Sequence, residues 1–350
     1  MVRKSSLKGY LLEEALAWLM RHSGYELLVS DTQDPDELLT ERGSLWVKGR
    51  GTNHQVDVLG EFAFTPAFSL PVRLFLEAKF LSRAADIRVV RNAHGTLADV
   101  NQNFVAIASS RPRRRFQYCY ALFSANGFTP EAEAFALAHQ ISLVNLSIPG
   151  LSWLLDAVSR CADRLHAAAE RRRITRFPVG AMRTLIRQVL GTAPIPPSVE
   201  YSINAPRFRE DLELIVGEFA RALHEHGNSE LLIGFPPAPF VLPLTTESRS
   251  QFVDYSLTHP SHPVIMRPVR GNADGEWELS PRDAPGAYRV TFHLPKGIEV
   301  WLAESEERRS KRIRSVKSQF LSTITVYFEE GANLHVCHLR YEASQIAELR

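Results

Sequence analysis

Two short stretches of this chain carry residues that could do chemistry together: Asp57 and the triplet Glu77-Ala78-Lys79. Asp57 lies in one run of strand-forming residues, and the triplet ends the next run, 72–80. Because side chains alternate faces along a strand, Glu77 and Lys79 share one face. Two carboxylates bind a hard divalent cation such as Mg²⁺, with Mn²⁺ as a substitute, and a lysine beside it can orient a water. The pattern predicts metal-dependent hydrolysis of a phosphodiester.

A simpler interpretation stays open for the triplet alone. Glu-x-Lys on a strand commonly forms a solvated cross-strand salt bridge that stabilises little. A carboxylate and an amine on an otherwise apolar strand are nevertheless costly to bury unpaired. Asp57 on the neighbouring strand would complete a cation site with Glu77, beside Lys79. The elements that surround the two strands decide between these interpretations.

The composition is that of a globular protein with about two domains. The chain has 350 residues, of which 45% are hydrophobic and 23% charged, and its net charge is +2. The positive charges are clustered rather than spread. Arg111, Arg113, Arg114 and Arg115 form one cluster, and two further clusters lie at 171–176 and 308–317. Such clusters can follow phosphates, although any one of them is at least as often a solvated helix face or a linker.

The cellular setting is predicted to be cytoplasmic. Three widely spaced cysteines argue against a disulfide framework. The N-terminal segment leads into an amphipathic helix that contains Glu13 and Glu14, unlike a signal peptide, and no apolar run is long enough to span a membrane.

The first half of the chain is predicted to be an α/β sandwich. Hydrophobic spacing predicts, in order, a helix at 7–28, strands at 56–62 and 72–80, a helix at 84–107 that breaks near His94-Gly95, a strand at 118–124, a helix at 129–139 and a strand at 141–146. Residues 30–55 are polar and glycine-containing and are interpreted as loops. We expect domain one at 1–150, a helical, arginine-rich linker at 151–200 that ends in a proline run, and an α+β domain at 201–350.

The second half is expected to contain a helix at 207–226, five short strands and one basic helix. The strands are predicted at 230–235, 262–269, 287–294, 321–328 and 333–340, and the basic helix near 303–318. Target recognition, regulation or oligomerisation are its possible roles.

Four blocks in this order resemble the Mrr-like restriction endonuclease domain of the PD-(D/E)XK nuclease superfamily. The blocks are Gly9 to Glu13 with the closing Gly24-Tyr25, the glycine-containing segment 49–58 that ends on Asp57, the stretch Leu76-Glu77-Ala78-Lys79, and the strand and helix from Ala121 to Ala136. The run before Asp57 is less glycine-rich than in many members. The resemblance covers the N-terminal domain only.

The resemblance implies a restriction-endonuclease-like sandwich, a central mixed sheet flanked by helices, and assigns roles to named residues. Asp57 and Glu77 would bind the metal, and the carbonyl of Ala78 could join them. Lys79 would position the attacking water, and Glu13 would complete the metal or water shell. Gln55, two positions before Asp57, would touch the scissile phosphate or a water, unless it is an ordinary polar strand residue. Apart from the resemblance, we predict that Arg50, Arg111, Arg113, Arg114 and Arg115 contact nucleic acid.

The implied activity is Mg²⁺-dependent endonucleolytic cleavage of DNA, in restriction or anti-phage defence. We expect a homodimer or higher homo-oligomer, since two strands need two sites, with defence-system proteins as further partners and no membrane. A repair nuclease or junction resolvase, and a non-catalytic nucleic-acid-binding scaffold on the same fold, remain as alternatives.

Overall fold

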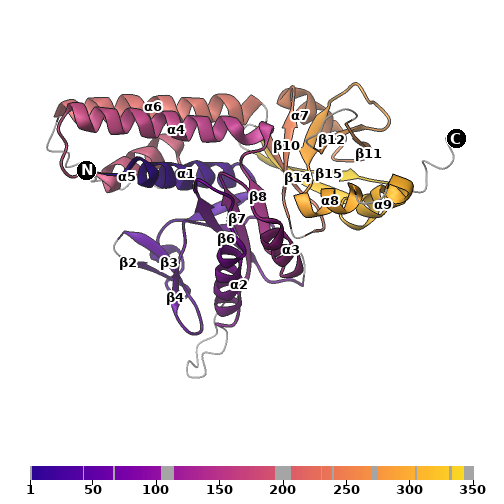
Figure 1. The fold of residues 1–350 in the computed structure, drawn as a ribbon, viewed down its shortest axis with the longest axis horizontal. Coiled ribbons are helices and arrows are strands. Elements are labelled where there is room, and N and C mark those ends of the chain that lie inside the picture. The colour runs from indigo at the N-terminus through magenta and orange to yellow at the C-terminus, as the bar shows by residue number, and fades with distance from the viewer. Residues whose placement is uncertain are drawn as a thin grey trace.

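A computed structural model describes residues 2–41, 43–65, 68–103, 114–193, 206–229, 231–238, 240–269, 275–303, 306–330 and 333–342. Figure 1 shows long helices packed over a sheet in the first part of the chain and a strand-rich body in the last part. The predicted mixed α/β architecture is confirmed, and part of it is a closed seven-stranded barrel.

The first part contains a five-stranded mixed sheet in the order β1-β5-β6-β7-β8. Its two antiparallel pairs are β1 with β5 and β5 with β6, whereas β6, β7 and β8 run parallel. The elements are α1 (Lys4–Arg21), β1 (Tyr25–Leu28), the short 3-10 helix η1 (Asp31–Gln33), β2 (Leu38–Glu41), β3 (Ser44–Lys48), β4 (Asn53–Gln55), β5 (Val58–Phe62), β6 (Val72–Lys79), α2 (Ile87–Asn101), β7 (Gln117–Ser124), α3 (Pro130–Ala138) and β8 (Ser142–Asn145).

The predicted helix at 7–28 is too long at its C-terminal end. α1 ends at Arg21, and Gly24, with φ of +85°, turns the chain back into β1. The predicted break near His94-Gly95 is also wrong. α2 runs through both residues because Val90, Ala93 and Val100 hold its buried face.

Residues 30–55 form more structure than loops. β2, β3 and β4 make a separate antiparallel sheet, which Figure 1 shows beside α2. Val47 of β3 is fully buried in the same core cluster as Val90 of α2. Because β4 is the last strand of this small sheet, the sheet lies directly before Asp57 in the chain.

The two faces of the large sheet have separate apolar cores. Leu59, Phe75 and Leu122 belong to the core on the α2 and α3 side. Val58 and Leu76 belong to the core on the side of α1. Alternation along the strand thus places Glu77 and Lys79 together on the Phe75 face, as the sequence predicts, and this face points away from α1.

Three helices between Pro149 and Ser229 pack on α1. They are α4 (Pro149–Arg171), α5 (Val179–Leu190) and α6 (Pro206–Ser229). Apolar residues from all three share one buried cluster with α1. The linker predicted at 151–200 corresponds to α4 and α5, and the helix predicted at 207–226 corresponds to α6. All three pack with α1, and the domain boundaries at 150 and 200 stay a prediction.

The last part closes into a barrel in the order β10-β13-β12-β11-β15-β14-β9, with β9 pairing back to β10. Its elements are β9 (Leu231–Phe235), β10 (Leu242–Thr246), α7 (Arg249–Thr258), β11 (Ser261–Pro268), β12 (Glu276–Pro281), β13 (Val290–His293), α8 (Lys296–Ala303), α9 (Glu306–Gln319), β14 (Thr323–Glu330) and β15 (Asn333–Arg340). All five predicted strands and the basic helix are confirmed. The strands β10 and β12 and the helices α7 and α8 were not expected.

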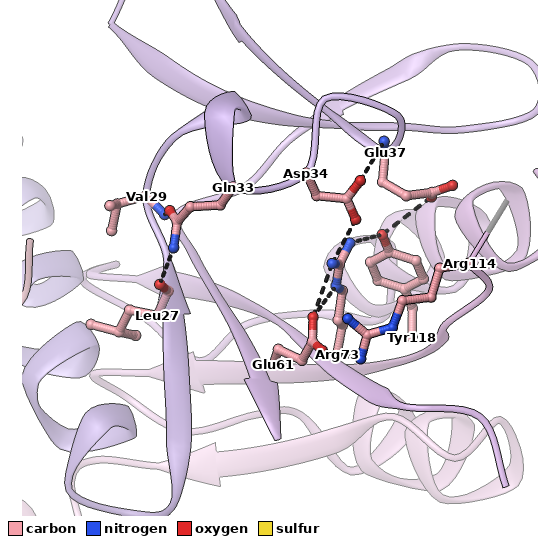
Figure 2. Close-up of polar contacts among 9 residues, drawn as sticks. All are labelled: Leu27, Val29, Gln33, Asp34, Glu37, Glu61, Arg73, Arg114 and Tyr118. Carbon is pink, nitrogen blue, oxygen red and sulfur yellow. Dashed lines mark hydrogen bonds and ion pairs between the residues drawn. The ribbon is translucent and has the colours of Figure 1, made fainter. Parts of the chain in front are cut away.

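A buried arginine fixes the start of β6 (Figure 2). The guanidinium of Arg73, only 2% exposed, donates to Asp34 at 2.6 Å and to Glu61 at 2.9 Å. It also donates to the hydroxyl of Tyr118 at 3.3 Å. The same guanidinium lies over the ring of Phe116. Because a buried charge needs such partners, this cluster ties the segment after β1 to the sheet and holds β6 in place.

Candidate active site

Asp57 lies where β5 is about to begin, opposite the end of β6. In the antiparallel register Val58 pairs with Leu76, so one further step places Asp57 opposite Glu77. The ladder does not continue there. Instead Asp57 Oδ2 accepts a hydrogen bond from the backbone N–H of Ala78 at 2.9 Å. The sheet itself thus positions this carboxylate against the Glu77-Ala78-Lys79 triplet.

Glu77 is held by two side chains. Lys79 Nζ makes an ion pair with Glu77 Oε1, and the hydroxyl of Tyr120 donates to Glu77 Oε2 at 2.7 Å. The side chains of Glu77 and Lys79 are only 23% and 29% exposed, so this pair is more enclosed than a solvated surface bridge. Tyr120 belongs to β7, where its ring stacks on Phe75 at 4.8 Å. Sequence reasoning missed Tyr120, although the alternation of β7 offered a signal.

Burial and a neighbouring carboxylate make the ionised form of Asp57 less favourable. Burial raises the pKa of Asp57, and the charge of Glu77 raises it further, against the opposing effects of the Ala78 amide, Lys79 and Arg183. Burial, together with the charges of Glu77 and Asp57, also raises the pKa of Tyr120. A cation bound at this place would relieve that repulsion.

Glu13 reaches the site from α1, together with an arginine that the sequence did not suggest. Arg183 of α5 pairs with Glu13 at 2.7 Å and with Glu14 at 2.6 Å. Burial raises the pKa of Glu13 to about 7; Arg183 lowers it, whereas Asp57 and Glu14 add to the increase. The helix that supplies Arg183 was interpreted as linker. Adjacent glutamates on one helix, with arginines one turn apart on another, were the available signal.

Gln55 is the last residue of β4, opposite Trp46 of β3. Its side chain is exposed, and its Nε2 lies 3.5 Å from Ser44 Oγ. Gln55 and Asp57 line the same two surface hollows, which are described below, so the two side chains lie near each other as predicted.

The glycine-containing segment before β4 is tied to α2. Asp99 accepts a hydrogen bond from the N–H of Gly51 at 2.8 Å and pairs with His54 Nε2 at 2.8 Å. The guanidinium of Arg50 donates to Gln102 at 3.3 Å. The segment is therefore anchored to the helix that forms the other wall of the site.

The predicted arginine cluster is only partly described. Arg111 and Arg113 lie outside the described residues. Arg114 donates to Glu61 at 2.8 Å (Figure 2). Glu61 pairs with Arg73, so this contact lies at the opposite end of β6 from Glu77. Arg115 is exposed. Contact of these arginines with nucleic acid stays a prediction, and the pairing of Arg114 gives it a structural role.

A hollow of about 430 Å³ opens onto the carboxylates. Asp57, Glu77 and Tyr120 line its inner end. Its walls come from β3, β4 and α2. A smaller hollow of about 60 Å³ lies on the other side of Asp57, against Glu13 and Arg183. Asp57 thus stands between a space open to a ligand and a nearly filled one.

The donor set suits a hard cation with few protein ligands. Within the part of the chain that the structure describes, no three or more His, Cys, Asp or Glu side chains gather as a metal-binding group. Asp57 and Glu77 offer two carboxylates, and the Ala78 carbonyl is adjacent. Mg²⁺ commonly uses one or two carboxylates, water and substrate phosphate oxygens, so this set fits it.

Comparison with known proteins gives no family assignment. No protein-family model and no curated protein matches the chain. One solved structure, a crystal structure of a protein of unknown function, AF1548, is similar over 63% of this chain and 99% of its own, at 17% identity and a TM-score of 0.32. That similarity is too low to support an argument about fold or function. Among the described residues, no helix is long and apolar enough to cross a membrane.

Proposed function

We propose that this protein is a metal-dependent endonuclease that hydrolyses DNA phosphodiester bonds, built on a restriction-endonuclease-like sandwich. One observation carries the proposal: the Ala78 amide holds the Asp57 carboxylate at the end of the strand that bears Glu77 and Lys79. Two carboxylates that line an open hollow, with an amine paired to one of them, are the groups that phosphodiester hydrolysis needs.

Asp57, Glu77 and the Ala78 carbonyl would hold Mg²⁺, with Mn²⁺ as a substitute. When bound, the cation stabilises negative charge on the phosphate and makes water a better nucleophile. The raised pKa of Asp57 supports this assignment, because burial and the charge of Glu77 leave the site in need of positive charge.

The chain's own residues orient the reactants. Lys79 carries a compact ammonium that donates to a water or a phosphate oxygen. Tyr120 fixes Glu77 through its hydroxyl, and Glu13 lies on the far side of Asp57, where it borders the smaller hollow. These contacts give the site its geometry before any substrate arrives.

The setting belongs to the same proposal: a cytoplasmic nuclease in restriction or anti-phage defence, acting as a homodimer or larger homo-oligomer with defence proteins as partners. The repair nuclease, the junction resolvase and the non-catalytic scaffold are the alternatives. DNA cleavage by the purified chain would distinguish the three enzymes from the non-catalytic scaffold.

The test is incubation of supercoiled plasmid with the purified chain in Mg²⁺, in Mn²⁺ and in chelator. Lys79→Ala and Lys79→Arg should both lose cleavage by orders of magnitude while metal binding, measured by calorimetry, persists. The matched control is Lys4→Ala, which removes an exposed ion pair with Asp163 at 3.1 Å and should cut normally. Normal cleavage by Lys79→Ala, or none by the parent chain, would refute the proposed mechanism.

A further inference from the structure

The open hollow beside Glu77 has an outer wall that the hydrolytic groups do not explain. Trp46 and Asn53 come from the small sheet, and Asn92 and Thr96 from α2. Asn92 and Thr96 are one helical turn apart and so lie on the same side of α2. We propose that this wall binds a nucleobase next to the scissile phosphate, so that the nuclease domain itself reads DNA sequence.

The wall has the chemistry of base recognition. A side-chain amide offers a donor and an acceptor side by side, and this is the arrangement that pairs with the edge of a base. Asn53 of β4 and Asn92 of α2 bring two such groups to the hollow. Trp46 adds an aromatic ring, on which a base can stack.

The charge of the wall argues against a second phosphate. Among the described residues, no lysine or arginine lines this hollow. Its one basic side chain, His54, already pairs with Asp99 at 2.8 Å. Because phosphate sites rely on Lys and Arg, a neutral amide-bearing wall favours the base.

The size of the hollow fits the same ligand. About 430 Å³ lies within the range of small-molecule sites, and a nucleotide is such a molecule. The inner end carries Asp57 and Glu77, so a nucleotide with its phosphate there would place its base toward the wall.

Base preference is measured by cutting a pool of linear DNA duplexes with a randomised central segment and sequencing the ends. The same pool is also bound to the protein in chelator, and the retained duplexes are sequenced. The variants are Asn92→Ala, on an exposed helical position where alanine favours folding, and Trp46→Leu. The control is Gly95→Ala on α2, because Gly95 is exposed and an added Cβ meets nothing within 4 Å.

We expect the parent chain to prefer one base at a position flanking the cut. Asn92→Ala should reduce that preference about fivefold or more, since one well-placed base contact supplies that much discrimination. Trp46→Leu should weaken retention of all sequences by about fivefold or more, since it removes a stacking surface. Gly95→Ala should match the parent chain in both assays.

The inference rests on the proposed function, and the two assays separate their failures. If Asn92→Ala cuts with the same base preference as the parent chain, or if neither protein shows a base preference, the base site is wrong and the proposed nuclease activity is unaffected. Base-selective retention that Asn92→Ala loses, without cleavage by any protein, overturns the nuclease and supports the base site. Neither cleavage nor retention overturns both.

Discussion

The buried carboxylate of Glu14 predicts a large loss of stability when Arg183 is removed. Glu14 is only 1% exposed and contacts Arg183 at 2.6 Å and Arg187 at 2.9 Å. Arg183 also pairs with Glu13 at 2.7 Å. Arg183→Met keeps most of the side-chain volume but leaves buried negative charge undercompensated, and breaking such a pair costs about 3–5 kcal/mol.

Two further variants calibrate this magnitude. Arg187→Met should cost less, about 1.5–3 kcal/mol, because Glu14 keeps its contact with Arg183. The control is Arg209→Met on α6. Arg209 pairs with Glu213 at 2.8 Å, but both side chains are about half exposed, so its loss should cost under about 1 kcal/mol.

The measurement is hydrogen–deuterium exchange of the full chain in urea, followed on peptides of α1 and α5, because the chain is too large to treat as two-state. The double variant Glu14→Gln/Arg183→Met should lose less than the two single losses combined, because removing the carboxylate removes the penalty. A loss for Arg183→Met as small as that for Arg209→Met would show that this network does not hold α5 on α1.

Three further predictions concern the site and its support. The pKa of Glu13 is about 7 in the folded chain, against 4.5 ordinarily, so the folded state binds more protons than the unfolded state between these pH values. The free energy of unfolding of the metal-free chain should therefore fall by up to about 3 kcal/mol as the pH rises from about 4.5 to 7. The melting temperature of Glu13→Gln should change less with pH over this range. Tyr120→Phe removes the donor to Glu77 and should cost about 1–3 kcal/mol, measured by hydrogen–deuterium exchange in urea on peptides of β6 and β7, and it should slow plasmid cleavage. Unchanged values in both assays would show that this hydrogen bond does not support the site. Gly49→Ala would bring a Cβ against the carboxylate of Asp99 and within 2.5 Å of a backbone oxygen, so it should lower the melting temperature and release the segment before β4, visible as faster amide exchange there.

Much of the candidate site could be predicted because it depends on local periodicity. Alternation along β6 assigns Glu77 and Lys79 to one face, and pairing of two successive strands brings Asp57 beside them. Both features need only short sequence separations. The start of α3 could also be predicted from the sequence, because Thr129 is a typical N-cap residue and its side chain accepts a hydrogen bond from the Ala132 N–H.

The remaining parts of the site depend on packing between distant segments. Arg183 reaches Glu13 because α5 packs on α1. The spacing of Arg183 and Arg187 indicates an acidic partner but does not say which helix supplies it. The small sheet was missed because its strands have three to five residues and its glycines suggested loops. Its Val47 is buried by contact with the α2 core, which a sequence pattern alone does not reveal.

The closed barrel has a consequence for how the chain folds as it is synthesised. β9 pairs with β10, which follows it closely, but its other edge pairs with β14, where Phe235 faces Thr325, 90 positions later. At roughly 5–20 residues per second, β9 waits about 5–20 seconds on the ribosome for that partner. Pairing of β5 with β6 needs no such delay. The sheet that carries Asp57 and Glu77 can therefore form while β9 still has an unpaired edge, and that interval is when this chain is most exposed to wrong strand pairing.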